Sequence, residues 1–217
     1  MSIYLVTGAN GFVGRRMVQL LRDQGCAVRA VVRKHSMPVM SDIDDIIAMG
    51  SNGAETQWGN ALHDIDCVIH LAARVHVMDE TLSNPLDAFR KVNVAGTLKL
   101  AKDAATAGVR RFVFISSVKV NGEETFEYPF NEDMQPCPAD PYGVSKLEAE
   151  EGLRNLAAET GIEVVIIRPP LVYGPGVKAN FLSMMKWVSK GVPLPLGAVD
   201  NKRSFVALDN LVDLICV

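Results

Sequence analysis

The sequence predicts an α/β fold with a doubly wound parallel sheet. Short apolar runs rich in β-branched residues alternate with longer segments of helical periodicity, a pattern typical of repeated βα units. The runs are apolar throughout, as expected for strands covered on both faces. With 217 residues, the chain is long enough for one such domain and too short for two large ones.

The expected elements follow in order along the chain. We expect strands at residues 3–7, 27–32, 46–49, 67–72, 112–116 and 163–168, and helices at residues 12–24, 86–107 and 142–160. Gly108 and Gly161 follow two of these helices, where a C-terminal cap favours glycine. The polar segment 121–141 is longer than a plain connection requires and is a candidate functional loop. After residue 168 the chain is rich in proline, with a helix expected at 179–190, which indicates an irregular cap above the sheet.

Composition and charge exclude several classes of protein. Apolar residues make up 48%, charged residues 22%, and the net charge is −3, so neither disorder nor a nucleic-acid surface is expected. The apolar runs are too short to span a membrane, and the N-terminus has no signal-peptide pattern, so we expect a cytoplasmic protein. The cysteines and histidines have no metal-ligand spacing, so no metal site is expected, and His70 is expected to be structural.

A glycine-rich turn at residues 7–14, with the sequence TGANGFVG, follows the first strand and opens the first helix. This is the context that a dinucleotide-binding fingerprint requires, because glycines allow a tight turn and a close approach of the main chain to a pyrophosphate. The alternative is a turn that binds nothing. We expect cofactor contacts from Gly8, Asn10, Gly11, Phe12, Val13 and Gly14.

The end of the second strand bears on the choice of cofactor. An acidic residue there would bind the ribose hydroxyls of NAD, whereas an arginine accommodates the 2′-phosphate of NADP. The strand ends in Val32, Arg33 and Lys34 without an acidic residue, which favours NADP over NAD and makes Arg33 a candidate contact. A solvated basic strand end is the alternative.

Tyr142 and Lys146 lie four residues apart at the start of a predicted helix, so both project from one face. A nearby cation favours the phenolate, so Lys146 is expected to help Tyr142 act as a base. Upstream, a buried strand ends at Ser116 and Ser117. Ligands bind outside the carboxyl ends of parallel strands, so Ser117 is a candidate for a substrate hydrogen bond.

Together, these motifs resemble the extended short-chain dehydrogenase/reductases, specifically the NAD-dependent epimerase/dehydratase family that acts on nucleotide sugars. The resemblance also covers VIHLAA at residues 68–73, NVAGT at 93–97, RPPLVYGP at 168–175 and RSFV at 203–206. It implies a Rossmann-type domain at residues 1–168, and a small, partial substrate-binding region at residues 169–217.

The resemblance also implies roles for individual residues. Ser117, Tyr142 and Lys146 would form a proton relay while a hydride moves between a sugar C4 and the nicotinamide. Asn93 would support the helix that carries Tyr142, and Arg203 would bind the substrate diphosphate, a role that its forked donors suit. The further cofactor contacts would be Leu71, Ala72, Ala73, Asn93, Ile115, Tyr142, Lys146, Pro169, Pro170 and Leu171. The substrate contacts would be Ser117, Lys119, Asn180 and Arg203.

The sequence departs from the family pattern in three places. Many members carry Ser/Thr-x-x-Val-Tyr-Gly where this chain has SVKVNG at residues 117–122, so Lys119 either contacts a phosphate or is solvated. The acid after the second strand is missing. Members usually continue well beyond this length, so only part of the substrate cap is expected.

We therefore predict an oxidoreductase or epimerase that acts at C4 of a nucleotide-linked hexose, either a UDP-sugar 4-epimerase or a 4-ketosugar reductase. The resemblance implies a homodimer built from the helices at 86–107 and 142–160. The alternatives are a non-catalytic NAD(P)-binding sensor and a shortened, inactive homologue. A sensor has no chemical need for Ser117, Tyr142 and Lys146 together, which argues against it.

Overall fold

A computed structural model describes residues 2–33, 45–50, 53–75, 84–125, 128–177, 179–191, 193 and 200–217 of the chain, without the side chains of Ala179 and Asn180. Six parallel strands form one sheet in the order β3-β2-β1-β4-β5-β6. Their bounds are β1 (Ile3–Thr7), β2 (Ala27–Arg33), β3 (Asp45–Met49), β4 (Cys67–His70), β5 (Arg111–Ile115) and β6 (Glu163–Ile167). The doubly wound α/β fold and each of the six expected strands are confirmed.

The helices also agree with the sequence pattern. They are α1 (Phe12–Asp23), α2 (Pro85–Phe89), α3 (Gly96–Thr106), α4 (Pro141–Thr160), α5 (Ala179–Ser189) and α6 (Leu208–Cys216). The expected helix at 86–107 is α2 and α3 joined by a π-helical segment, η3 (Arg90–Ala95). Gly108 and Gly161 have φ angles of 81° and 77°, the left-handed conformation that their cap positions require.

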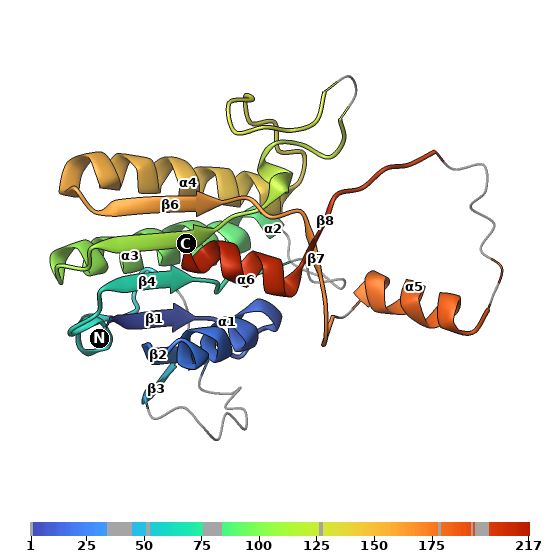
Figure 1. Ribbon diagram of the computed structural model, residues 1–217. Coiled ribbons are helices and arrows are strands. Elements are labelled where there is room, and N and C mark those ends of the chain that lie inside the picture. Colours follow the sequence, from blue (N-terminus) through green and yellow to red (C-terminus); the bar gives the residue numbers. More distant parts are fainter. Residues whose placement is uncertain are drawn as a thin grey trace.

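Each face of the sheet is covered by a different set of helices (Figure 1). On one face, Phe112 and Phe114 of β5 pack with Leu100 of α3 and Leu153 of α4. On the other face, α1 and α6 pack together and contribute Met17, Leu21, Leu211 and Val212. Coverage of both faces explains why the strand sequences are apolar throughout.

The residues after 168 divide between the core and the edge of the sheet. Strands β7 (Leu171–Tyr173) and β8 (Phe205–Ala207) form a second, two-stranded parallel sheet. Helix α5 stands beyond the carboxyl ends of the main strands (Figure 1), whereas α6 belongs to the core shared with α1. The predicted region 169–217 thus shares part of its packing with the predicted domain 1–168.

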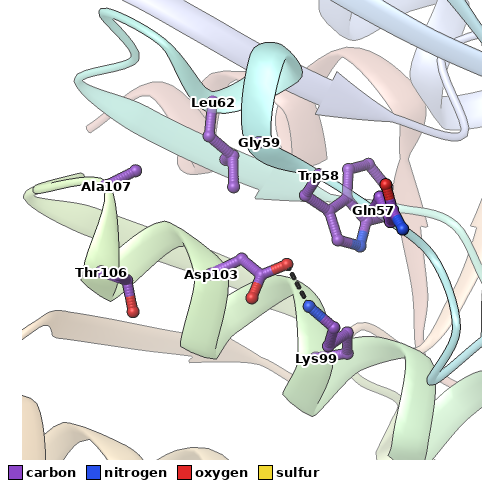
Figure 2. A pocket seen from close by; sticks show the side chains of 8 residues that line it. All are labelled: Gln57, Trp58, Gly59, Leu62, Lys99, Asp103, Thr106 and Ala107. Carbon is purple, nitrogen blue, oxygen red and sulfur yellow. Dashed lines mark hydrogen bonds and ion pairs between the residues drawn. The ribbon is translucent and has the colours of Figure 1, made fainter.

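A surface pocket of about 330 Å³ lies on the α3 side of the molecule (Figure 2). It is lined by α3 and by residues around the short 3₁₀ helix η2 (Gly59–Leu62), and the Lys99–Asp103 ion pair of 2.5 Å runs along α3 on its α3 side. The Trp58 side chain is buried there, and its indole nitrogen has no hydrogen-bond partner among the described residues. None of the predicted site residues lines this pocket.

The described part of the chain contains no helix with the length and apolar character needed to cross a membrane.

Helix α1 packs directly on the turn that precedes it. A Cβ atom at Gly14 would lie 2.1 Å from the carbonyl oxygen of Gly8 and 2.8 Å from the Cα of Ala9. Both neighbours are backbone atoms, so neither can rotate away. Only glycine allows the helix to start this close to β1.

We predict that Gly14→Ala lowers the free energy of unfolding by at least about 2 kcal/mol, because the added methyl group forces α1 away from the turn. Urea unfolding followed by circular dichroism measures the loss. Gly59→Ala is the control, since a Cβ there meets no atom within 4 Å. Equal stability of the two variants would show that α1 does not need the close contact.

Candidate active site

The carboxyl ends of the parallel strands bring the predicted cofactor residues to one edge of the sheet. The chain order reverses between β1 and β4, which is where α/β proteins of this kind bind ligands. Gly8 has a φ angle of 66°, and a Cβ on it would lie 2.9 Å from the nitrogen of Ala72. The glycine turn and the segment Leu71, Ala72 and Ala73 therefore lie in contact.

The first turn of α1 fits a pyrophosphate. Gly11 is the N-cap residue, so no side chain caps the helix, and the first turn contains no acidic residue. The N–H groups and the positive end of the helix dipole thus face a position that favours an anion. Asn10, Phe12 and Val13 are partly buried around this turn, and Arg15 Nε donates to the Asn10 carbonyl at 3.0 Å.

A buried chain of hydrogen bonds fixes the glycine turn against β4. Thr7 Oγ1 lies 2.7 Å from His70 Nδ1 and accepts from the Ala72 N–H at 3.2 Å. His70 Nε2 lies 3.0 Å from Thr97 Oγ1 on α3. Burial, with the nearby charge of Lys146, lowers the pKa of His70 to about 3, so the ring is neutral. The expectation of a structural histidine is confirmed.

Arg33 is exposed at the carboxyl end of β2, next to β1 and the glycine turn. This position is compatible with the predicted contact to an adenosine ribose. Lys34, the second predicted cation, lies outside the described residues.

The start of α4 is held by several independent contacts. Pro141 occupies the first helical turn, and Asp140 caps the helix by accepting from the Gly143 N–H at 2.6 Å. A Cβ on Gly143 would lie 2.8 Å from the carbonyl oxygen of Lys119, so α4 touches the turn that follows β5. This contact brings the Ser117 region and the Tyr142 region together.

Tyr142 and Lys146 project from α4 toward the end of β5. Lys146 is buried, and its Nζ donates to the Ile115 carbonyl at 2.8 Å. The same nitrogen lies 4.4 Å from the centre of the Phe114 ring and 5.9 Å from that of the Tyr142 ring. Tyr142 packs edge-on against Phe89 of α2, with 6.1 Å between the ring centres.

Burial and nearby charges shift the pKa values of both members of this pair. Burial lowers the pKa of Lys146 to about 7, although the carboxylate of Glu150 acts in the opposite direction. Burial and the Asp140 carboxylate raise the pKa of Tyr142 to about 12. Burial and the Asp140 carboxylate thus favour the neutral phenol in the chain alone, and the expected effect of Lys146 on the phenolate stays a prediction.

Asn93 links the π-helical segment to α4. Its Oδ1 accepts from the Arg74 N–H at 2.8 Å, and its Nδ2 donates to the Arg74 carbonyl and to Ser145 Oγ, each at 3.0 Å. Ser145 in turn donates to the Tyr142 carbonyl at 2.8 Å. These bonds agree with the predicted support of the helix that carries Tyr142 and Lys146.

Lys119 belongs to the turn η4 (Val118–Val120) after β5, and Ser117 is the N-cap residue of this turn. Ser117 is partly exposed, and its Oγ accepts from the Lys119 N–H at 3.3 Å. Lys119 Nζ forms ion pairs with Asp140 and with Glu123. Partial burial alone would lower the pKa of Lys119, but the hydrogen bonds to these carboxylates raise it. Lys119 therefore links η4 to the cap of α4, a role that the sequence did not suggest.

The remaining predicted contacts lie in the C-terminal region. The Pro169 carbonyl accepts from the Val118 N–H at 3.1 Å, so the segment of Pro169, Pro170 and Leu171 runs beside η4. Arg203 is exposed just before β8, and no carboxylate in the described part of the chain pairs with it. Asn180 lies in the first turn of α5, and its side chain lies outside the described atoms.

Sequence reasoning missed a buried polar cluster behind this site. Glu150 of α4 is completely buried and accepts hydrogen bonds from Ser116 of β5's end and from Arg168 after β6. The acidic sequence EAEEG at residues 148–152 looks like a solvated helix face. Only its position four residues after Lys146, on the same face, could have indicated burial.

A sequence profile described as the NAD dependent epimerase/dehydratase family matches residues 4–217. This chain belongs to that family. The family recognition made from the motifs is thus confirmed, and the matched range includes both the glycine turn and the residues of α4.

Among relatives of the family, a UDP-glucose 4-epimerase of Vibrio cholerae is 48% identical over 213 residues, which are 97% of this chain and 64% of that protein. The chain thus spans about half to two thirds of the length of the curated relatives it matches.

Solved structures of the family have the same fold. MoeE5 in complex with UDP-glucose and NAD superposes with a TM-score of 0.81 at 31% identity, covering 99% of this chain and 71% of that one. A UDP-glucose 4-epimerase of Thermotoga maritima with UDP-glucose gives a TM-score of 0.80 at 26% identity, covering 97% and 71%.

The buried ammonium leads to a prediction about pH. Because the pKa of Lys146 falls from 10.5 to about 7 on folding, the unfolded chain binds more protons between these values, and stability rises with pH across that window. Lys146→Met removes this rise. The free energy of unfolding of the variant minus that of the parent should therefore fall by about 2–3 kcal/mol from about pH 6 to about pH 9.

Urea unfolding at the two pH values measures this difference. Lys102→Met, which removes an exposed ammonium from α3, is the control and should show no such change. A constant difference for Lys146→Met would mean that the ammonium is not buried in the folded chain.

Proposed function

We propose that this chain is a nicotinamide-dependent UDP-sugar 4-epimerase that works through a proton relay of Tyr142, Lys146 and Ser117. The observation that carries the proposal is the contact between Gly143 and Lys119, which brings the tyrosine and lysine of α4 against the serine turn after β5. The glycine turn stands at the same edge of the sheet. The names of the Vibrio cholerae and Thermotoga maritima relatives favour a 4-epimerase over a 4-ketosugar reductase.

The residues suit a reversible oxidation of a secondary alcohol. When bound, an oxidised nicotinamide supplies a hydride acceptor that can return the hydride to either face of the resulting ketone. Tyr142 takes the hydroxyl proton as the alcohol is oxidised and returns it as the ketone is reduced. Ser117 donates a hydrogen bond to the same substrate oxygen, and Lys146 stabilises negative charge on Tyr142.

The high pKa of Tyr142 limits when this relay can operate. At about 12, the phenol is a poor base near neutral pH. A positively charged nicotinamide ring close to the phenol would lower that pKa, as would protonation of Lys146. Proton abstraction by Tyr142 is thus expected to need added positive charge nearby, which a bound oxidised cofactor or a protonated Lys146 would supply.

The cofactor would be held by the glycine turn, with the pyrophosphate at the first turn of α1. MoeE5 binds NAD. In this chain Arg33 at the end of β2 is suited to a 2′-phosphate, so we propose that NADP binds at least as tightly as NAD. A nucleotide-sugar diphosphate would be bound by Arg203, with Lys119 and Asn180 as further predicted contacts.

We also propose a homodimer that pairs the helices α2, α3 and α4 of two copies, and a cytoplasmic setting. Sedimentation velocity tests the dimer.

We predict that purified protein interconverts UDP-glucose and UDP-galactose, and that Tyr142→Phe slows this by about a hundredfold or more, because the proton acceptor is lost. Product stereochemistry is read by NMR, and absorbance of the reduced nicotinamide is followed with UDP-sugars and their 4-keto derivatives. Tyr4→Phe, at the start of β1, is the control. Net consumption of reduced cofactor would indicate a reductase, and cofactor binding without turnover, unchanged in Tyr142→Phe, would favour a sensor.

We further predict that Arg33→Gln weakens NADP binding about tenfold and leaves NAD binding nearly unchanged, because the 2′-phosphate loses a charge-assisted hydrogen bond. Isothermal titration with each cofactor measures both affinities. Arg22→Gln, an exposed change at the end of α1, is the control. Equal loss of both affinities would contradict a contact to the 2′-phosphate.

A further inference from the structure

We propose that Glu150 is a positioning residue of the site, a buried carboxylate one turn from Lys146 on α4 that holds the end of β5 against this helix. The effect of Glu150 on turnover rests on the proposed function. Its effect on the titration of Lys146 does not depend on that function and can be tested without substrate.

The contacts of Glu150 join three elements. Ser116 Oγ at the end of β5 donates to Glu150 Oε1 at 2.6 Å. Arg168, just after β6, donates to the same carboxylate through Nε at 2.9 Å and through Nη2 at 2.6 Å. The completely buried carboxylate thus receives a forked guanidinium, and Arg154, one turn further along α4, also donates to it, at 3.1 Å.

Two side chains of α4, one turn apart, thereby bind two consecutive residues at the end of β5. Lys146 binds the Ile115 carbonyl at 2.8 Å, and Glu150 binds the Ser116 hydroxyl. The Ser116 N–H is also fixed, since it donates to the Ile167 carbonyl at 2.7 Å. Ser117 follows immediately, so its place relative to Tyr142 depends on these bonds.

The network continues into the polar loop above the site. Arg168 Nη1 donates to Asn121 Oδ1 at 3.3 Å, and Asn121 Nδ2 donates to the Asn131 carbonyl at 3.1 Å. Asn121 is itself buried. The same carboxylate that holds β5 thus anchors the start of the predicted functional loop through Arg168.

Glu150 also determines the charge balance around Lys146. In the described part of the chain, the groups that face Lys146 are neutral His70 of β4, the Phe114 ring and Ile115 carbonyl of β5, and Tyr142 and Glu150 of α4. Burial opposes the ammonium, and Glu150 is the charge that favours it.

The test follows the titration of Lys146 directly, in the full chain without substrate. Lysine labelled with ¹⁵N at Nζ gives a side-chain signal that is assigned by its loss in Lys146→Arg. In Glu150→Gln the titration midpoint should fall by about one pH unit, because the neighbouring negative charge is gone. The matched control is Glu151→Gln, which removes the same charge from the next, exposed position of α4.

Glu150→Gln leaves the partly buried Arg168 without its carboxylate partner, so Glu150→Gln/Arg168→Gln is measured as well. The double variant should also lower the midpoint, but by less than Glu150→Gln, because loss of the neighbouring guanidinium charge favours the ammonium. With UDP-glucose, kcat of the folded variants should fall about tenfold or more with little change in KM, as expected for misplaced groups. Glu151→Gln should match the parent.

A midpoint for Lys146 that stays within the error of the parent in a folded variant would overturn the proposal, even if the parent epimerises. A shifted midpoint in a parent that shows no epimerisation would support the role of Glu150 toward Lys146 and would count against the proposed function alone.

Discussion

The burial of one ammonium group organises the functional edge of this protein. Lys146 lies in the contact between α4 and β5, where a positive charge is costly unless it is compensated. The compensation comes from the Ile115 carbonyl, the face of the Phe114 ring and the charge of Glu150. Each partner belongs to the end of β5 or to α4 itself, so the packing that compensates the burial of Lys146 also fixes the two elements that carry the proposed relay.

The glycine turn imposes a second constraint of a different kind, which is purely steric. The backbone of Gly8 packs against that of Ala72, and the backbone of Gly14 packs against that of Gly8. Neither position can therefore accommodate a side chain. The Thr7–His70–Thr97 chain then fixes the same strands through hydrogen bonds. Backbone packing and these hydrogen bonds therefore hold the first turn of α1 in place, and prearrangement of this kind lowers the entropic cost of binding a ligand.

The sequence allowed most of the fold to be predicted because its signals are local. Strand runs, the glycine spacing and the cap positions of Gly108 and Gly161 each depend on a few neighbouring residues, and Tyr142 and Lys146 face one way because they share a helix. The missed features depend on residues far apart in the chain. Glu150 meets Arg168 only after α4 and β6 pack, and Lys119 meets Asp140 across 21 positions. The raised pKa of Tyr142 was not predicted for a related reason. This pKa depends on a balance between burial and charge that no local pattern reveals.

That balance determines the protonation of the proposed relay. With the pKa of Tyr142 raised and that of Lys146 lowered, the chain alone holds a neutral phenol beside an amine that is partly protonated near neutral pH. In that state the phenol is a poor base, and the amine is only partly charged and so stabilises a phenolate poorly. Added positive charge at the edge of the sheet would lower the pKa of Tyr142 and favour the phenolate. The charge of Glu150 favours the ammonium form of Lys146, which would stabilise that phenolate. Under the proposed function, Tyr142 would therefore act as a base only where added positive charge, such as an oxidised nicotinamide would supply, lowers its pKa.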